Sequence, residues 1–257
     1  MGRLKICTWN IQLGSRIDAV LETIAEHRDF SGLDVLALQE ASEHNGLPDA
    51  RRVASRLGPA FSEHQFTSQI VGGQVQANAL VWDGGRLCST SPGVLRLPLM
   101  ADPSGIRRFE AWLLQKLPAQ QRGGVLVDGR LGDEMVRIYS VHFDVIGVGH
   151  RLRQLAAVLA DNAMRPAVSV CVIAGDLNTF GLRRRPAWSA LAASLSAARF
   201  QDVTRELPWT HTTRRLRLRQ KLDAVLVSQR PGLSHRAWTV ATNASDHLPV
   251  FVELQWG

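Results

Sequence analysis

The stretch 173–179 places two polar side chains directly after a strongly apolar run. Residues 170–174 read Val-Cys-Val-Ile-Ala, and Gly175 ends this predicted buried strand. Asp176 and Asn178 follow at positions i and i+2, so on an extended backbone they leave the strand on the same side. A carboxylate and an amide held there can bind a metal-bound oxygen or orient a water molecule. A turn is the alternative interpretation, because glycine, aspartate and asparagine all favour turns.

Other polar side chains lie at the ends of at least four more predicted strands. The carboxylates and amides among them are hard oxygen donors, which Mg²⁺ and Mn²⁺ prefer as ligands. The two histidines, with carboxylates nearby, suit proton transfer and stabilisation of charge on a phosphoryl group. If the strand ends meet at one edge of a sandwich, these side chains form a single site. The full set is Asn10, Glu40, His142, Asp176, Asn178, Asp223, Asp246 and His247.

Each of these residues also has a purely structural interpretation. His142 fits a buried core histidine, Glu40 fits a turn cap, and the Asp-His pair at 246–247 carries little information alone. Several other chemistries are disfavoured by the motifs that the sequence lacks. It has no Cys/His spacing typical of zinc, no serine nucleophile elbow, and no glycine-rich nucleotide loop after the first predicted strand.

The elements that must position this set are mostly strands. Helical periodicity occurs in both halves of the chain, and short apolar runs separated by glycine-rich turns outnumber the helices. Asp128-Gly129 is a predicted hairpin turn. This pattern predicts an α+β sandwich of two sheets with helices outside, in one domain spanning residues 1–257. The predicted strands are 4–9, 33–38, 77–82, 86–97, 109–117, 125–127, 135–143, 170–174, 222–227 and 248–254, and the predicted helices are 17–24, 48–57, 152–159 and 186–195.

Composition limits the class of protein and of partner. A chain of 257 residues that is 45% hydrophobic can bury a large core. Its formal net charge of +7 favours an anionic partner. Cys7, Cys88 and Cys171 are widely spaced and fit buried thiols in a reducing compartment. No apolar segment is long enough to span a membrane and no signal-peptide pattern precedes Leu4, so we expect a cytoplasmic monomer without a transmembrane segment.

Six short motifs occur in the order typical of one known superfamily. The motifs are Thr8-Trp9-Asn10, Leu38-Gln39-Glu40, Ser140-Val141-His142, Gly175-Asp176-Leu177-Asn178, Lys221-Leu222-Asp223 and Ser245-Asp246-His247-Leu248-Pro249-Val250. On these motifs the chain resembles the endonuclease/exonuclease/phosphatase superfamily, the DNase I-like phosphohydrolases, from residue 7 to residue 254. The resemblance implies a four-layer α/β/β/α sandwich of two mainly antiparallel sheets and metal-assisted hydrolysis of a phosphoester.

The resemblance implies a metal site and a phosphate contact. Glu40 matches the family's main metal ligand, with Asn10 and Asp246 at or next to the metal, which is expected to be Mg²⁺ or Mn²⁺. His142 matches the histidine that hydrogen-bonds the phosphate.

The resemblance also implies the groups that act on water and on charge. Asp176 matches the aspartate that positions or deprotonates the attacking water, and Asn178 matches an asparagine that contacts phosphate oxygens. Asp223 and His247 match a carboxylate–histidine pair in which the acid orients the imidazole and raises its basicity. The number of metal ions that take part stays open at this point.

Two further positions match the family less closely. Asn78, within Ala77-Asn78-Ala79-Leu80, resembles an asparagine near the phosphate, but a hairpin amide is an equal alternative. Arg108 resembles an arginine that approaches the phosphate, but a surface arginine is an equal alternative.

A row of basic residues precedes the candidate aspartate at 223. If residues 215–223 are extended, alternation puts Arg215, Arg217, Arg219 and Lys221 on the face that carries Asp223. Such a row suits a substrate with several phosphates in line. A solvated basic loop is the alternative, because one bulge breaks the alternation.

The substrate class is the least constrained inference. We expect nucleic acid, with a phospholipid-headgroup hydrolase of the sphingomyelinase type or an inositol-phosphate phosphatase as the alternative, and a catalytically inactive binding module as a third. The abasic-site branch of the superfamily has a tyrosine in its middle motif, whereas Tyr139 here precedes His142 by three residues. Abasic-site repair is therefore disfavoured. Intact Glu40, Asp176, Asp246 and His247 argue against an inactive member.

Overall fold

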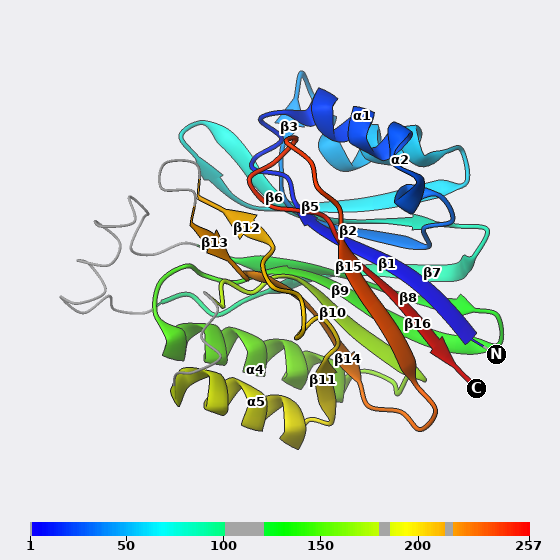
Figure 1. The fold of residues 1–257 in the computed structure, drawn as a ribbon, viewed down its shortest axis with the longest axis vertical. Coiled ribbons are helices and arrows are strands. Elements are labelled where there is room, and N and C mark those ends of the chain that lie inside the picture. Colours follow the sequence, from blue (N-terminus) through cyan, green and yellow to red (C-terminus); the bar gives the residue numbers. More distant parts are fainter. Residues whose placement is uncertain (1, 101–120, 180–185, 214–217) are drawn as a thin grey trace.

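Two six-stranded sheets pack face to face, and a pair of helices covers the outer side of each (Figure 1). This computed structural model describes residues 2–100, 121–179, 186–213 and 218–257. The four layers and the two mainly antiparallel sheets confirm the predicted α/β/β/α sandwich. The first sheet has the strand order β15 (Ser234–Thr239), β16 (Val250–Trp256), β1 (Gly2–Asn10), β2 (Val35–Ala41), β6 (Gln74–Asp83) and β5 (Phe61–Val71).

The second sheet repeats this arrangement on the other side of the core. Its order is β11 (Phe200–Asp202), β14 (Asp223–Ser228), β10 (Val170–Asp176), β9 (Glu134–His142), β8 (Gly123–Leu131) and β7 (Leu87–Arg96). Helices α1 (Ile17–Glu26) and α2 (Asp49–Leu57) cover the first sheet, and α4 (Val148–Met164) and α5 (Pro186–Ala197) cover the second (Figure 1). The shorter elements are η1 (Arg28–Phe30), β3 (Glu43–His44), β4 (Leu47–Pro48), β12 (His211–Thr212) and β13 (Arg219–Gln220).

The central strands are apolar along their whole length because both of their faces are covered. In β1, Leu4 and Ile6 belong to the core between the sheets, whereas Cys7 and Trp9 belong to the core beneath α1 and α2. This alternation is the period of two expected for an extended chain. A strand buried on both faces reads as a continuous hydrophobic run, which is why these strands could be located from the sequence.

Each sheet has one parallel pair near its centre, and these pairs determine where polar side chains gather. Strands β1 and β2 are parallel, as are β9 and β10, so their carboxyl ends share an edge. The register places Asp176 opposite His142 on β9 and opposite Asp223 on β14. Asn10 lies opposite Gln39 in the other sheet. The topology therefore brings strand ends from distant parts of the sequence to one edge of the sandwich.

Strands β8 and β9 form the predicted hairpin, but its turn does not lie at the predicted position, Asp128-Gly129. Both residues lie within β8, and the register pairs Leu131 with Glu134, so the turn falls at Gly132-Asp133. Gly132 has φ +61°, a conformation that glycine adopts without strain, whereas a Cβ on Gly129 would meet the Leu87 side chain at 2.8 Å. The glycine at 129 is thus explained by the contact with β7 and not by a turn.

Other expectations have mixed outcomes. The four predicted helices are present, three of them with longer bounds and α2 one residue shorter, but β5 and β15 were not predicted as strands. Cys7 and Cys171 are buried free thiols, as expected, whereas Cys88 is exposed. The strand predicted over 109–117 lies outside the described residues. Within the described ranges, no helix is long and apolar enough to cross a membrane.

Candidate active site

The polar strand ends surround a cavity of about 320 Å³. Seven of the eight residues in the predicted set line it, and the eighth, Asp223, lies fully buried behind His247. The cavity also contains residues that the sequence interpretation missed, among them a histidine and two glutamines. The lining residues are Asn10, Gln12, Glu40, His142, Val145, Asp176, Asn178, His211, Thr213, Gln220, Leu222, Asp246 and His247.

Asp176 is the buried carboxylate on which the hydrogen bonds of the site converge. Its Oδ2 accepts a hydrogen bond from Asn10 Nδ2 at 3.1 Å, and its Oδ1 accepts one from the backbone N–H of Asn178 at 3.0 Å. Burial, with a further contribution from the negative charge of Asp223, raises the pKa of Asp176 from its usual value to about 6. At neutral pH this carboxyl is therefore mostly ionised but remains able to accept a proton.

Gly175 allows Asp176 to lie next to the histidine of the neighbouring strand. A Cβ at position 175 would lie 1.9 Å from the carbonyl oxygen of Val141, so only glycine permits this approach of β9 and β10. The approach leaves His142 Nε2 at 3.6 Å from Asp176 Oδ2. Asn178 has φ +50° and its Nδ2 donates to the Phe143 carbonyl at 2.9 Å. The segment from Gly175 to Asn178 thus forms a turn and also supplies side chains to the site, so the two interpretations of this stretch are compatible.

Asp223 and His247 form the expected pair. His247 Nδ1 lies 2.8 Å from Asp223 Oδ2, and both side chains are buried. Burial lowers the pKa of His247, but the carboxylates of Asp223, Asp176 and Asp246 outweigh it and raise that pKa to about 10. His247 is therefore an imidazolium at neutral pH, with Nε2 at 3.8 Å from Asp176 Oδ2.

Arg122 is a buried cation that the sequence interpretation missed. Its Nη1 lies 3.2 Å from His142 Nδ1, and a guanidinium can only donate, so His142 Nδ1 accepts. The ring proton of His142 is then on Nε2, which faces the cavity. Burial lowers the pKa of Arg122, and the acidic groups of Asp144, Glu40 and Asp176 oppose that shift. Arg108, the arginine expected near the phosphate, lies outside the described residues.

Arg122 left only a weak sequence signal. It is the residue before Gly123-Gly124, where the strand that pairs with the His142 strand begins. An arginine before an apolar run is ordinary in itself, because most arginines lie at the surface. Only the pairing of β8 with β9 shows that its side chain turns inward.

Glu40 reaches the cavity because β2 is irregular at that residue. Its φ of +51° is unusual for a residue other than glycine, and the pairing of β2 with β6 shifts register between Gln39 and Ala41. A bulge of this kind turns a side chain toward a site. Gln76 Nε2 donates to Glu40 Oε1 at 3.1 Å and fixes the carboxylate from β6.

Asp246 lines the cavity from the loop before β16. Gln12 Nε2 donates to Asp246 Oδ2 at 3.0 Å, and His211 Nε2 lies 3.9 Å from the same oxygen. The His211 and His247 rings are 4.5 Å apart between centroids. Burial lowers the pKa of His211, and the charge on His247 lowers it further. A neutral His211 thus lies beside a charged His247.

The donor set fits a hard divalent cation. Within the described residues, two trios of acidic and histidine side chains are close enough to share an ion: His211 with Asp246 and His247, and Asp176 with Asp223 and His247. Both trios include His247, and an imidazolium has no lone pair for a metal. The remaining donors that open on the cavity are oxygens of Asn10, Glu40, Asp176 and Asp246, which match the preference of Mg²⁺ and Mn²⁺.

Asn78 does not line the cavity. It is buried, and its Nδ2 donates to the carbonyl oxygen of Gly123 at 2.5 Å, which ties β6 to the start of β8 next to Arg122. This contact agrees with the alternative of a structural amide.

The expected row of basic side chains does not form among the described residues. Arg219 is exposed, and Lys221 is buried with Nζ 3.6 Å from Asp202 Oδ2. Gln220 and Leu222 instead line the cavity of Asp176 and His247, which we call the catalytic cavity for the role proposed below. Arg215 and Arg217 lie outside the described residues.

A turn in the backbone explains why the alternation fails. The N–H groups of Leu222 and Asp223 both donate to Thr210 Oγ1. Consecutive N–H groups of a straight strand point to opposite sides, so the chain must turn between β13 and β14.

Comparisons with known proteins agree with this geometry. The chain matches the sequence profile of the Endonuclease/Exonuclease/phosphatase family over residues 7–247. A search of curated protein sequences returned no match.

Solved structures of low sequence identity share the fold. An endonuclease/exonuclease/phosphatase from Bacteroides vulgatus has a TM-score of 0.71 and 15% identity, and the alignment covers 100% of both chains. The human Nocturnin catalytic domain with bound sulfate anion has a TM-score of 0.71 and 16% identity over 99% of this chain and 95% of that one. A mannosyl-6-phosphatase from Bacteroides thetaiotaomicron has a TM-score of 0.68 and 14% identity over 98% and 100%. The chain described here belongs to the endonuclease/exonuclease/phosphatase family, whose members are phosphoester hydrolases.

Proposed function

We propose that this protein is a Mg²⁺- or Mn²⁺-dependent phosphodiesterase and that its substrate is nucleic acid. The observation that carries the proposal is the pairing of Asp176, a buried carboxyl with a pKa of about 6, with a charged His247 and a hydrogen-bonded His142 around one cavity. These groups supply a proton acceptor and two hydrogen-bond donors for a phosphoryl group.

The metal would be held by Glu40, Asn10 and Asp246. Each has an oxygen that opens on the cavity, and Gln76 and Gln12 donate hydrogen bonds that orient the two carboxylates. A divalent cation supplies Lewis-acid chemistry there, because it neutralises a non-bridging phosphate oxygen and stabilises the leaving oxygen.

Asp176 would position the attacking water and accept its proton. A general base works best when its pKa lies near the working pH, and burial brings Asp176 to about 6. Hydrogen bonds from Asn10 and from the Asn178 backbone hold the carboxylate in place and leave its orientation fixed. The side-chain amide of Asn178 would contact a phosphate oxygen, although its Nδ2 also donates to Phe143.

The two histidines would stabilise negative charge in different ways. His247 carries a full positive charge, because Asp223 holds the proton on Nδ1 and leaves Nε2–H to face the substrate. His142 is a neutral donor through Nε2, because Arg122 occupies its Nδ1. Developing charge on the equatorial oxygens is therefore met by fixed donors in a buried site, where such contacts are strongest.

Nucleic acid is favoured over a lipid headgroup by charge. The net charge of +7 attracts a polyanion, and Arg16 and Arg219 lie in a second cavity that adjoins the site. One solved structure with this fold is a mannosyl-6-phosphatase, so the fold also serves a sugar phosphate. A phospholipid-headgroup or inositol-phosphate hydrolase is therefore the alternative.

The experiment is an activity panel with Mg²⁺ or Mn²⁺, covering single- and double-stranded DNA, RNA, sphingomyelin and inositol phosphates. We expect cleavage of nucleic acid by the wild type and loss of that cleavage in Asp176→Asn and in the presence of EDTA. Turnover of lipid or inositol phosphate alone would contradict the nuclease proposal. Binding of nucleic acid without turnover of any phosphoester would indicate an inactive binding module.

A further inference from the structure

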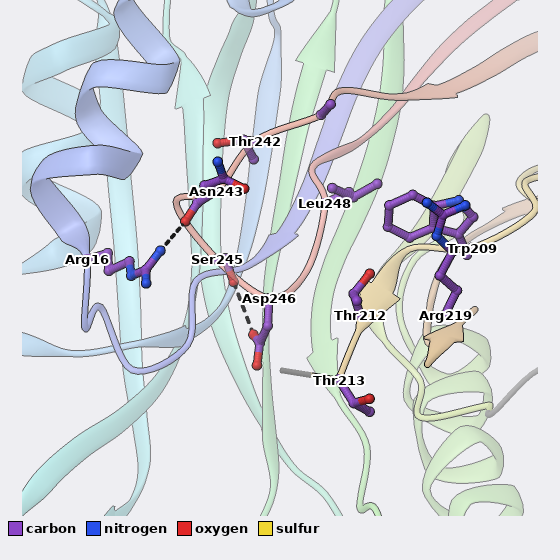
Figure 2. A pocket seen from close by; sticks show the side chains of 11 residues that line it. Arg16, Trp209, Thr212, Thr213, Arg219, Thr242, Asn243, Ser245, Asp246 and Leu248 are labelled. Atoms are coloured by element: carbon purple, nitrogen blue, oxygen red, sulfur yellow. Dashed lines mark hydrogen bonds between the residues drawn. The ribbon is translucent and has the colours of Figure 1, made fainter. Parts of the chain in front are cut away.

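A second cavity adjoins the catalytic cavity and has a different lining. It encloses about 850 Å³, and Thr213 and Asp246 line both cavities. Because they share these residues, the two cavities adjoin each other, and we call the second one the Trp209 pocket (Figure 2). Its other lining residues include Arg16, Trp209, Thr212, Arg219, Asn243 and Leu248.

The β12–β13 hairpin forms the wall between the two cavities. In its register, His211 lies opposite Gln220 and Thr212 lies opposite Arg219. Neighbouring side chains of a strand point to opposite faces. The first pair lines the catalytic cavity, and the second pair lines the Trp209 pocket. One short hairpin therefore fixes the separation between the reacting phosphate and the occupant of the pocket.

One end of the pocket is flat and aromatic. The guanidinium carbon of Arg219 lies 4.6 Å from the centroid of the half-buried Trp209 ring, and Leu248 lines the same end (Figure 2). A stacked indole and guanidinium together form a planar, polarisable surface. Nucleobases stack on such surfaces in proteins that bind single strands.

The other end of the pocket is cationic. Arg16 donates from Nη1 to the carbonyl oxygen of Asn243, and Figure 2 shows these two residues at the end away from Trp209. Within the described part of the chain, the contacts of Arg16 and Arg219 are with a backbone carbonyl and with the Trp209 ring, and neither arginine forms an ion pair with a carboxylate. Asp246 is the acidic group of the pocket, and it faces the catalytic cavity as well. Two arginines without acidic partners attract an anion.

We propose that the Trp209 pocket binds an unpaired nucleotide next to the scissile phosphate, so that the preferred substrate is single-stranded nucleic acid. The base stacks on Trp209 and Arg219, and a neighbouring phosphate lies against Arg16. A duplex keeps its bases paired and stacked on one another, so it cannot offer a base to Trp209 without unpairing. An inositol phosphate has no planar ring to stack, and an acyl chain gains nothing from Arg16. The inference rests on the proposed function, since it takes the catalytic cavity as the position of the scissile phosphate.

The test measures binding and turnover separately. The binding assay uses a fluorescently labelled single-stranded octanucleotide in EDTA, titrated with wild type, Trp209→Ala, Trp209→Phe and Arg219→Ala. Arg236→Ala is the matched control, because Arg236 lies over Trp238 at 5.1 Å in the same type of pair, on an edge strand outside both cavities. We expect Trp209→Ala to raise the Kd about tenfold or more, Trp209→Phe to restore most of the affinity, and Arg236→Ala to leave it unchanged.

Competition and turnover assays decide whether the Trp209 pocket binds an unpaired nucleotide. Unlabelled single strand should displace the probe better than the matching duplex or inositol hexakisphosphate, and Trp209→Ala should reduce that preference. Equal effects of Trp209→Ala and Arg236→Ala, or displacement by inositol hexakisphosphate as effective as by the single strand, would overturn the pocket. Hydrolysis of bis(4-nitrophenyl) phosphate by the wild type is assayed in parallel with metal. Failure of this hydrolysis would contradict the proposed function. If the hydrolysis succeeds but Trp209→Ala binds the octanucleotide as tightly as the wild type, the pocket alone is contradicted.

Discussion

The charge state of single side chains decides what the site can do. His247 and Asp176 lie within 3.8 Å of each other, yet their pKa values are shifted to about 10 and about 6. A carboxylate that can accept a proton thus lies beside an imidazolium that keeps its own. This separation of roles depends on Asp223, which is fully buried and hydrogen-bonded to His247 Nδ1.

Asp223→Asn should lower the pKa of His247. The amide removes the negative charge that opposes burial, so the ring loses its proton nearer to neutral pH. NMR titration of the metal-free protein should show a wild-type His247 that stays protonated at pH 7 and titrates near pH 10, and a lower value in the mutant. In turnover assays, the fold decrease in the kcat of the mutant should exceed the fold increase in its KM.

The raised pKa of His247 also makes the stability of the folded protein depend on pH. The folded-state pKa of His247 lies above the unfolded value of 6.5, so its contribution is full below pH 6.5 and is lost as pH rises through about 10. The stability difference between wild type and Asp223→Asn should therefore shrink across that range. A His247 that titrates at the same pH in both proteins would contradict the role given to Asp223.

The elements that bring the residues together are two parallel strand pairs, and the approach of β9 to β10 is the tightest point. Gly175 leaves no room for a side chain, because a Cβ would lie 1.9 Å from the Val141 carbonyl oxygen. Backbone atoms cannot rotate away as a side chain can. The spacing of His142 and Asp176 therefore depends on this glycine.

Gly175→Ala should destabilise the protein by about 2–4 kcal/mol, because the two strands must separate to admit the methyl group. Gly132→Ala is the control, since its φ is +61° and no atom lies within 4 Å of the new Cβ. That change should cost about 1 kcal/mol from backbone strain alone. Urea unfolding measures both, and equal losses would show that the contact with Val141 is unimportant.

At the scale of the whole molecule, the sequence predicts what depends on local pattern. Central strands such as β1 and β10 are buried on both faces, so their apolar runs are visible, and the polar residues that end them include Asn10 and Asp176. These residues lie 166 positions apart, yet their side chains share a hydrogen bond. The order of the motifs predicts this contact through the family resemblance, whereas composition alone does not.

The features that were not predicted depend on tertiary contacts. Arg122 faces inward only because β8 pairs with β9, and Lys221 turns away from the site because Thr210 Oγ1 accepts from two consecutive N–H groups. His211 reaches His247 through the β12–β13 hairpin, which contains only two paired positions on each strand. A ladder this short has no hydrophobic period to detect.

Strand ends from both sheets meet at the cavity at the edge of the molecule, where Glu40 is held in a strained bulge with φ +51°. A carboxylate held in this way contributes more to binding a cation than to the stability of the metal-free protein. Glu40→Gln should therefore leave folding intact and weaken metal binding, because it removes a charge that faces other acidic groups.

The most direct test is the rate of bis(4-nitrophenyl) phosphate hydrolysis by wild type and Glu40→Gln, after removal of metal with EDTA and titration with Mn²⁺. We expect no wild-type turnover without metal and full recovery on addition of Mn²⁺ or Mg²⁺. Glu40→Gln should require a higher Mn²⁺ concentration and turn over about 100-fold more slowly or worse at saturation. A wild-type rate that survives EDTA, or a mutant with unchanged Mn²⁺ dependence and rate, would contradict a metal-dependent site at this cavity.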